Sequence, residues 1–174
     1  MTNIALRALV TDITKLDAEA IVNAANESLL GGGGVNGAIH CAAGPDLLTE
    51  CRRLGGCDTG HAKITGGYKL PAKYVIHTVG PVWRGGDLNE ADKLSQCYRS
   101  VLKLTQDIGI ASIAFPAISC GAYNFPAPEA VRIAVKEIHR FPANGTLKEV
   151  TFACFSRDML ALHESELARY LVSE

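Results

Sequence analysis

Residues Ile21–Ile39, IVNAANESLLGGGGVNGAI, carry four consecutive glycines between a short apolar run and a helical pattern. Glycine has no Cβ, so such a loop can lie close to a ligand and turn its N–H groups toward an anion. A helix that begins directly after the loop adds free N–H donors and the positive end of its dipole. The stretch therefore predicts a phosphate-binding loop.

The composition is that of an ordinary globular domain. The chain has 174 residues, of which 48% are hydrophobic and 20% charged, and its formal net charge is −1. This length can bury one substantial core, so we expect a single domain over residues 1–174. The near-neutral charge, without a long run of Lys or Arg, argues against nucleic acid as a partner.

The six cysteines and the beginning of the chain bear on the cellular location. The cysteine spacings match no zinc signature, and a chain of this length needs no disulfide framework, so reduced thiols are expected. The amino terminus lacks a secretory pattern, and no apolar run is long enough to span a membrane. We therefore expect a cytoplasmic protein without membrane contacts, and a monomer.

Strand and helix patterns alternate along most of the chain. This alternation predicts an α/β fold with a largely parallel sheet covered on both faces. The run from Ala111 is almost wholly apolar, which is typical of a central strand. The expected strands are Ile4–Val10, Ala20–Ala25, Ala62–Thr65, Lys73–Val79, Ala111–Ile118 and Val150–Phe155, and the expected helices are Val35–Ala43, Pro45–Leu54, Ala91–Ile108, Pro128–His139 and Met159–Val172.

A second unusual loop, Ser119–Pro126, leaves a strand and enters a helix as the glycine loop does. Two such loops at one sheet edge can close over a diphosphate from opposite sides. Gly121 would permit close approach of the backbone, and Tyr123 or Phe125 would form a wall of the cleft. Phe155, at the end of the last strand, is either a surface that stacks on an adenine or an ordinary core aromatic.

Several polar residues near strand ends have two readings each. Asp12 follows the first strand and is either a ligand contact or a turn and cap residue. Asn23 and Asn26 either tie down the loop backbone or present amides to a ligand, and both roles are compatible. His77 lies within an apolar strand, where a hydrogen-bonded core histidine is more common than a catalyst.

Familiar enzyme motifs are matched only in part. Gly32–Gly37 has the letters of G-x-G-x-x-G, but the dinucleotide fingerprint needs its glycines directly after the first strand, and no P-loop occurs. Ser119 resembles the nucleophile elbow of serine hydrolases, yet Asp158 and His163 are too close together in sequence to look like separate triad loops. For Cys120 as a nucleophile, the sequence nominates no base. These classes are disfavoured.

Taken together, the motifs strongly resemble macrodomains, over nearly the whole chain and in order. The branch they resemble most is that of the MacroD-type ADP-ribose hydrolases, which also include O-acetyl-ADP-ribose deacetylases. The motifs are Asp12-Ile13, Val22-Asn23-Ala24-Ala25-Asn26, Leu30-Gly31-Gly32-Gly33-Gly34-Val35, Ala38-Ile39-His40, Ala42-Ala43-Gly44-Pro45, Ile76-His77-Thr78-Val79-Gly80-Pro81 and Phe115-Pro116-Ala117-Ile118-Ser119.

The resemblance implies a three-layer α/β/α fold with a mixed sheet and an ADP-ribose cleft along the strand ends. It implies ADP-ribose, O-acetyl-ADP-ribose or mono-ADP-ribosylated proteins as ligands, with no cofactor and no metal. By motif match, Asp12 would accept from the adenine amino group, Ile13 would pack on the ring and Phe155 would stack against it. Asn26 would bind the distal ribose beside the bond that is cut. The remaining ligand contacts would come from two groups of residues: Asn23, Ala24, Gly33, Gly34 and Val35 on one side, and Ser119, Cys120, Gly121, Ala122 and Tyr123 on the other.

Three positions depart from the family pattern. Thr11 stands where the family usually has Gly, and Ser119–Asn124 reads SCGAYN where it usually has STGVYG. The third departure is Asn36, where MacroD-type enzymes have an aspartate thought to activate or orient the attacking water. An asparagine cannot take a proton, and loss of a general base costs about 10²–10⁴ in rate.

Two hypotheses follow from the resemblance. In the first, the chain is a hydrolase in which Asn26 and Asn36 orient the water and a ligand phosphate can serve as the base. In the second, it is a module that binds ADP-ribose without turnover. A third, weaker hypothesis, RNA binding by the same loops, conflicts with the near-neutral charge.

Overall fold

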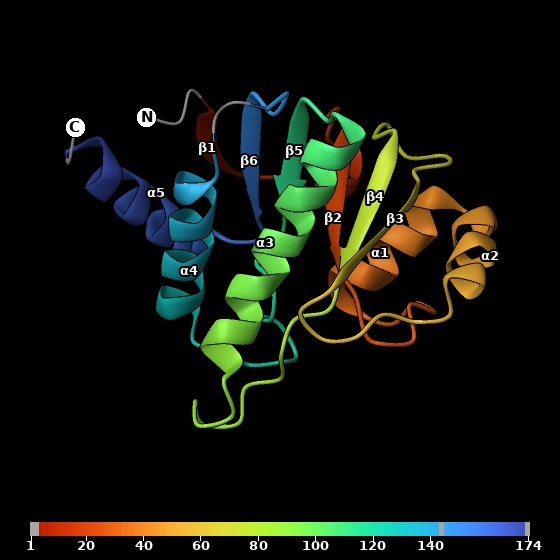
Figure 1. Cartoon of the computed structure of the whole chain (residues 1–174), viewed down its shortest axis with the longest axis horizontal. Coiled ribbons are helices and arrows are strands. Elements are labelled where there is room, and N and C mark those ends of the chain that lie inside the picture. The colour runs from red at the N-terminus through yellow and green to blue at the C-terminus, as the bar shows by residue number, and fades with distance from the viewer. Residues whose placement is uncertain (1–3, 143–144, 173–174) are drawn as a thin grey trace.

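A six-stranded sheet with helices on both faces makes up residues 4–142 and 145–172, the part of the chain that the computed structural model describes (Figure 1). The strand order is β1-β6-β5-β2-β4-β3; all neighbours pair in parallel except β3, which is antiparallel to β4. The predicted mixed, largely parallel α/β/α fold is confirmed. The elements are β1 (Ala5–Val10), a short 3₁₀ helix η1 (Ile13–Lys15), β2 (Ala20–Ala24), α1 (Gly34–Ala43), α2 (Pro45–Leu54), β3 (Ala62–Gly66), β4 (Tyr74–Thr78), α3 (Glu90–Ile108), β5 (Ser112–Phe115), α4 (Ala127–Arg140), β6 (Glu149–Cys154) and α5 (Arg157–Leu171).

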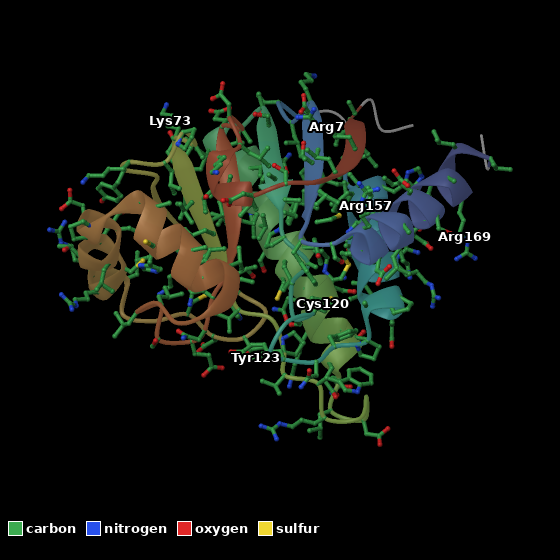
Figure 2. The ribbon with its side chains drawn as sticks, turned by 180° about the vertical axis from the view of Figure 1, so that it is seen from behind. Arg7, Lys73, Cys120, Tyr123, Arg157 and Arg169 are labelled. Atoms are coloured by element: carbon green, nitrogen blue, oxygen red, sulfur yellow. The ribbon has the colours of Figure 1, made fainter. Side chains whose placement is uncertain are left out.

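Two apolar layers hold the helices on the sheet. Successive strand residues point to opposite faces, so β2 sends Val22 into one layer and Ile21 into the other. The first layer joins the sheet to α3, α4 and α5, and the second joins it to α1 and α2. Figures 1 and 2 show these two faces: α3 and α4 lie in front of the sheet in the first view, and α1 and α2 in the second.

The parallel strands bring three loops to one edge of the sheet. The loops that follow β2, β4 and β5 all start from carboxyl ends, which lie at the same edge because these strands run parallel. They gather at the lower edge of the sheet in Figure 1, where α3 also begins. In open α/β sheets this is the edge where ligands bind.

Four strands end earlier than the sequence pattern predicts: β2, β4 and β6 by one residue each and β5 by three. The predicted strand Ala111–Ile118 is limited to Ser112–Phe115, because Pro116 has no N–H and the chain turns through a Cys120 N–H···O=C Ala117 bond. β6 ends at Cys154 and leaves Phe155 outside the sheet. α5 then begins at Arg157, two residues before the predicted start, with the Ser156 hydroxyl as its N-cap.

Candidate functional site

The glycine loop between β2 and α1 is tied down by Asn26. Its Nδ2 donates to the Gly31 carbonyl at 2.9 Å, and its Oδ1 accepts from the Ser28 hydroxyl at 2.7 Å. The prediction that Asn26 fixes the loop backbone is therefore confirmed. Its side chain is half-buried, which leaves a part of the amide accessible, and its contact with a ligand stays a prediction.

Gly33 and Gly37 are glycines for different reasons. A Cβ on Gly37 would overlap the Gly32 carbonyl, so the close packing of α1 against the loop requires this glycine. Gly33, the N-cap of α1, has extended backbone and no atom within 4 Å of a built Cβ. Neither backbone conformation nor packing demands glycine there. A side chain at position 33 would occupy the open space at the N-terminus of α1.

Asn36 lies in the first turn of α1 and is 5% exposed. Its Oδ1 accepts from Asn23 Nδ2 at 2.9 Å, and the same Nδ2 lies 3.1 Å from His77 Nδ1. Asn23 and His77 are register partners on β2 and β4, which brings the two side chains together. On the far side of the ring, His77 Nε2 lies 2.9 Å from Thr65 Oγ1 on β3.

The hydrogen-bond directions in this buried chain follow from its far end. The Thr65 hydroxyl donates to the Gly66 carbonyl, so its oxygen accepts from His77 Nε2–H and leaves His77 Nδ1 as an acceptor. Burial, with a smaller effect from the neighbouring His40, lowers the pKa of His77 to about 3, so the ring is neutral. Asn23 must therefore donate to both His77 and Asn36.

The free end of Asn36 is consequently its Nδ2 group. This atom lies 3.2 Å from a Cβ built on Gly32, under the glycine loop. We call the series Thr65–His77–Asn23–Asn36 the amide relay. His77 is confirmed as a hydrogen-bonded core residue. The relay as a whole is absent from the sequence prediction, although the polar residues inside buried strands were its signal.

Asn23 itself is more deeply placed than the sequence suggested. It has no exposed surface, and it holds Asn36 rather than the loop backbone. Its Oδ1 is buried and has no partner among residues 4–142 and 145–172. Direct contact with a ligand stays a prediction for Asn23, and the structure supports a role in holding Asn36.

The second loop is held in a strained conformation. Ser119 has φ of +65°, and its buried Oγ lacks a partner in the described part of the chain. Gly80, after β4, packs directly on it, because a Cβ on Gly80 would overlap that Oγ. Gly121 faces open space, as Gly33 does. Side chains of Cys120 and Tyr123 extend from the loop in Figure 2.

The loop after β4 supports the second loop. The Trp83 N–H donates to the Tyr123 carbonyl at 2.8 Å, and the Trp83 and Phe125 rings lie 4.8 Å apart. Phe125 is 3% exposed and belongs to the core, which corrects its proposed place as a wall of the cleft. Tyr123 is half-buried and keeps an accessible surface.

Asp12 and Phe155 lie at neighbouring strand ends. Val10 and Cys154 are register partners, and the Thr11 N–H donates to the Cys154 carbonyl at 3.1 Å. Asp12 Oδ1 caps η1 by accepting from the hydroxyl and N–H of Thr14, which lowers the pKa of Asp12. Its cap role is confirmed.

The apolar residues beside Asp12 differ in exposure. Ile13 is only 5% exposed, whereas Phe155 is 70% exposed, so the core reading of Phe155 is wrong. An aromatic ring left in solvent at this edge is available to stack on a ligand. The contacts of Asp12, Ile13 and Phe155 with an adenine stay predictions.

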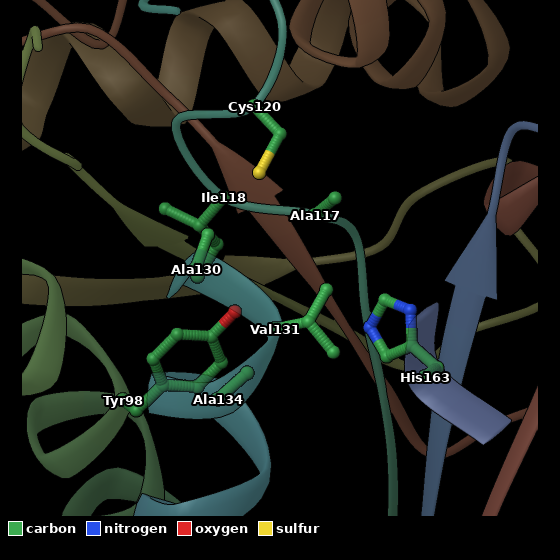
Figure 3. A pocket seen from close by; sticks show the side chains of 8 residues that line it. All are labelled: Tyr98, Ala117, Ile118, Cys120, Ala130, Val131, Ala134 and His163. Atoms are coloured by element: carbon green, nitrogen blue, oxygen red, sulfur yellow. The ribbon is translucent and has the colours of Figure 1, made fainter. Parts of the chain in front are cut away.

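The residues of the disfavoured enzyme classes are not arranged for catalysis. Cys120 and His163 line a narrow pocket that has no room for a water molecule (Figure 3). Burial raises the pKa of the Cys120 thiol to about 11, so it is protonated at neutral pH. His163 Nδ1 lies 2.8 Å from the Met159 carbonyl, on its own helix. All six cysteines are free thiols.

The fold and these loops define an α/β domain whose sheet edge carries two glycine-containing loops and an exposed aromatic. The family model described as "Macro domain" matches residues 22–134. The chain belongs to the macrodomain family, and its relatives place it in the MacroD-type branch.

Three relatives illustrate the similarity. Human ADP-ribose glycohydrolase MACROD2 is 62% identical over 134 residues, which cover 76% of this chain and 31% of that protein. The O-acetyl-ADP-ribose deacetylase of Citrobacter koseri is 53% identical over 163 residues, covering 91% of this chain and 92% of that protein. A Trypanosoma brucei macrodomain in complex with ADP-ribose superimposes with a TM-score of 0.84 at 45% identity, covering 95% of this chain and 69% of that one. In the described part of this chain, no helix is long and apolar enough to cross a membrane.

Proposed function

We propose that this chain binds ADP-ribose and hydrolyses mono-ADP-ribose from acidic side chains of proteins, the ester of O-acetyl-ADP-ribose, or both. The observation that carries the proposal is the placement of Asn36 under the glycine loop by the amide relay. The named activities of MACROD2 and of the Citrobacter deacetylase support it. The free thiols further fit a single cytoplasmic domain, which we propose to be monomeric.

Binding would use the open spaces that the two loops keep. The diphosphate would lie between Gly33, at the N-terminus of α1, and Gly121, where neither glycine is required by packing. Backbone N–H groups and the helix dipole favour an anion there. The adenine would lie between Phe155 and Ile13, with its amino group donating to Asp12.

The proposed reaction has water as its nucleophile. For an ADP-ribosylated carboxyl group, the water oxygen bonds to the distal ribose carbon, the bond from that carbon to the carboxylate oxygen breaks, and the carboxylate leaves. For O-acetyl-ADP-ribose, the water oxygen instead bonds to the carbonyl carbon of the acetyl ester, the bond from that carbon to the ribose oxygen breaks, and acetate and the free ribose hydroxyl are released. Asn26 and Asn36 would orient the water and the ribose, and a ligand phosphate would take the proton that Asn36 cannot accept.

A second candidate, a reader module that binds without turnover, is favoured by one observation. The amide relay leaves Nδ2, a hydrogen-bond donor, as the free end of Asn36. A donor binds the lone pair of a water and does not draw off its proton, so the water gains little nucleophilicity. The two candidates share one binding site and differ only in rate.

Two measurements separate them. Calorimetric titration with ADP-ribose tests the site, and binding is expected for both candidates. Single-turnover release of ADP-ribose from a mono-ADP-ribosylated protein then distinguishes hydrolase from reader. Absence of ADP-ribose binding would contradict both.

A further inference from the structure

The polypeptide of a modified protein must leave the proposed site next to the distal ribose. The bond to be cut joins the distal ribose to the protein, and Asn26 is the residue assigned to that ribose. Glu27 follows Asn26 directly and lines a cavity of about 270 Å³. The opposite wall is formed by the loop between β4 and α3, at the bottom of Figure 1.

We call this cavity the exit groove; its lining includes Glu27, Thr59, Val82, Arg84, Leu88 and Lys93. Two hydrogen bonds to Glu27 fix the first wall of the groove. The Thr59 hydroxyl donates to Glu27 Oε1 at 2.8 Å, and the Cys57 N–H donates to the Glu27 carbonyl at 2.8 Å. One carboxylate oxygen of Glu27 thus accepts a hydrogen bond from Thr59, while the side chain itself stays exposed.

The second wall is fixed by the buried carboxylate of Glu90. It accepts from the N–H groups of Arg84, Gly86 and Leu88 at 2.9, 2.8 and 2.6 Å. These bonds, that of Arg84 first, lower the pKa of Glu90 to about 2. The charge of Glu90 is therefore used to shape the loop, and it does not compete for a ligand in the groove.

The accessible side chains of the groove are two aliphatic residues, two cations and, at the end next to Asn26, the exposed carboxylate of Glu27. Val82 and Leu88 are 40% and 53% exposed, although both are aliphatic. Arg84 and Lys93 are exposed, and neither forms an ion pair within residues 4–142 and 145–172. Two unpaired cations beside an apolar strip fit a short extended peptide that carries acidic side chains.

We propose that the exit groove binds the polypeptide around the ADP-ribosylated residue and favours acidic residues next to it. The proposal rests on the proposed ADP-ribose site, because the ribose sets where the peptide begins. The modified carboxyl is an uncharged ester beside Glu27, so like-charge repulsion does not arise there. Acidic neighbours along the peptide would then meet Arg84 and Lys93.

The test compares ligands that differ only in the peptide. ADP-ribose alone, an ADP-ribosylated peptide with glutamates beside an uncleavable linkage, and the same peptide with glutamines are titrated by calorimetry. The double variant Arg84→Ala with Lys93→Ala should bind the acidic peptide about 3- to 10-fold more weakly, as expected for two exposed ion pairs. Its affinity for ADP-ribose should not change, and higher salt should remove the difference.

A matched control is available on α4. Arg132 and Lys136 are exposed cations that do not line the exit groove. The double variant Arg132→Ala with Lys136→Ala should leave the affinities for ADP-ribose, the acidic peptide and the glutamine peptide unchanged. Equal binding of the acidic and glutamine peptides, or an equal loss with the control variant, would overturn the exit groove while the ADP-ribose site stands. No ADP-ribose binding by the unaltered chain would instead overturn the proposed function, and this proposal with it.

Discussion

Replacing Asn36 by aspartate should raise the rate of hydrolysis at this site. Asn23 Nδ2 donates to Oδ1 of residue 36, and a carboxylate accepts that bond as well as an amide does. The second carboxylate oxygen would then replace Nδ2 under the glycine loop. Position 36 lies in the first turn of α1, where the helix dipole also favours a negative charge.

The expected size follows from the gain of a proton acceptor. A positioned general base contributes about 10²–10⁴ in rate, equivalent to about 3–5 kcal/mol of activation free energy. The new charge acts against binding, because the ligand is an anion. Two like charges about 8 Å apart at an effective dielectric of about 20 repel by about 2 kcal/mol before salt screening. The rate should therefore rise while the affinity falls.

The assay compares the chain and Asn36→Asp on one mono-ADP-ribosylated protein under single-turnover conditions, with ADP-ribose affinity measured in parallel. Asn36 precedes Gly37, a pair that deamidates readily where the backbone is mobile. The Gly37 N–H, which donates to the Gly33 carbonyl at 3.2 Å, restrains the pair. Mass spectrometry of the unaltered chain checks that the amide is intact. Equal rates for both proteins would contradict a general-base role for residue 36 and would leave the ligand phosphate as the base.

Three further predictions address the supporting structure. The free energy of unfolding should fall as the pH falls from about 6.5 toward 3, because His77 becomes protonated in the unfolded state but, with a pKa of about 3, stays neutral in the folded state. The expected loss is about 2–3 kcal/mol at pH 4.5. His77→Gln should remove this part of the pH dependence in urea unfolding, and an unchanged pH dependence would contradict the prediction. Gly80→Ala should overpack Ser119, which costs about 1–3 kcal/mol, and lower the melting temperature by about 2–10 °C. Gly145→Ala should change the melting temperature little, because the nearest atom to a built Cβ, Gln106 Cγ, is 4.0 Å away; equal shifts of the two variants in thermal unfolding would count against the clash. Phe155→Ala should leave the melting temperature unchanged, since the ring is 70% exposed, and weaken ADP-ribose binding about 5- to 100-fold in calorimetry; unchanged affinity would remove Phe155 from the adenine site.

Local patterns were sufficient for the architecture. Hydrophobic period and turn residues place most elements within two residues of their observed ends, and the apolar run from Ala111 predicts the interior position of β5. The main boundary error is at Pro116, where an apolar pattern continues past the last possible ladder bond. Hydrophobicity reports burial, and it carries no information about where a ladder must stop.

The site was harder to predict because its partners come from separate strands. Asn23 and His77 meet only through the β2–β4 register, and Thr65 reaches the ring diagonally from β3. No sequence spacing encodes those contacts. For Phe155, the sequence allowed either core or surface, and only the end of β6 at Cys154 decides it.

The amide relay also bears on how this family can change its activity. The relay holds residue 36 by one hydrogen bond to Oδ1, an atom that asparagine and aspartate have in common. The other residues of the relay, Thr65, His77 and Asn23, are neutral and buried. Codons for the two residues differ by one base. On the proposed role of residue 36, a lineage can therefore exchange fast removal of ADP-ribose for its retention in a single mutational step, with no compensating change in the core.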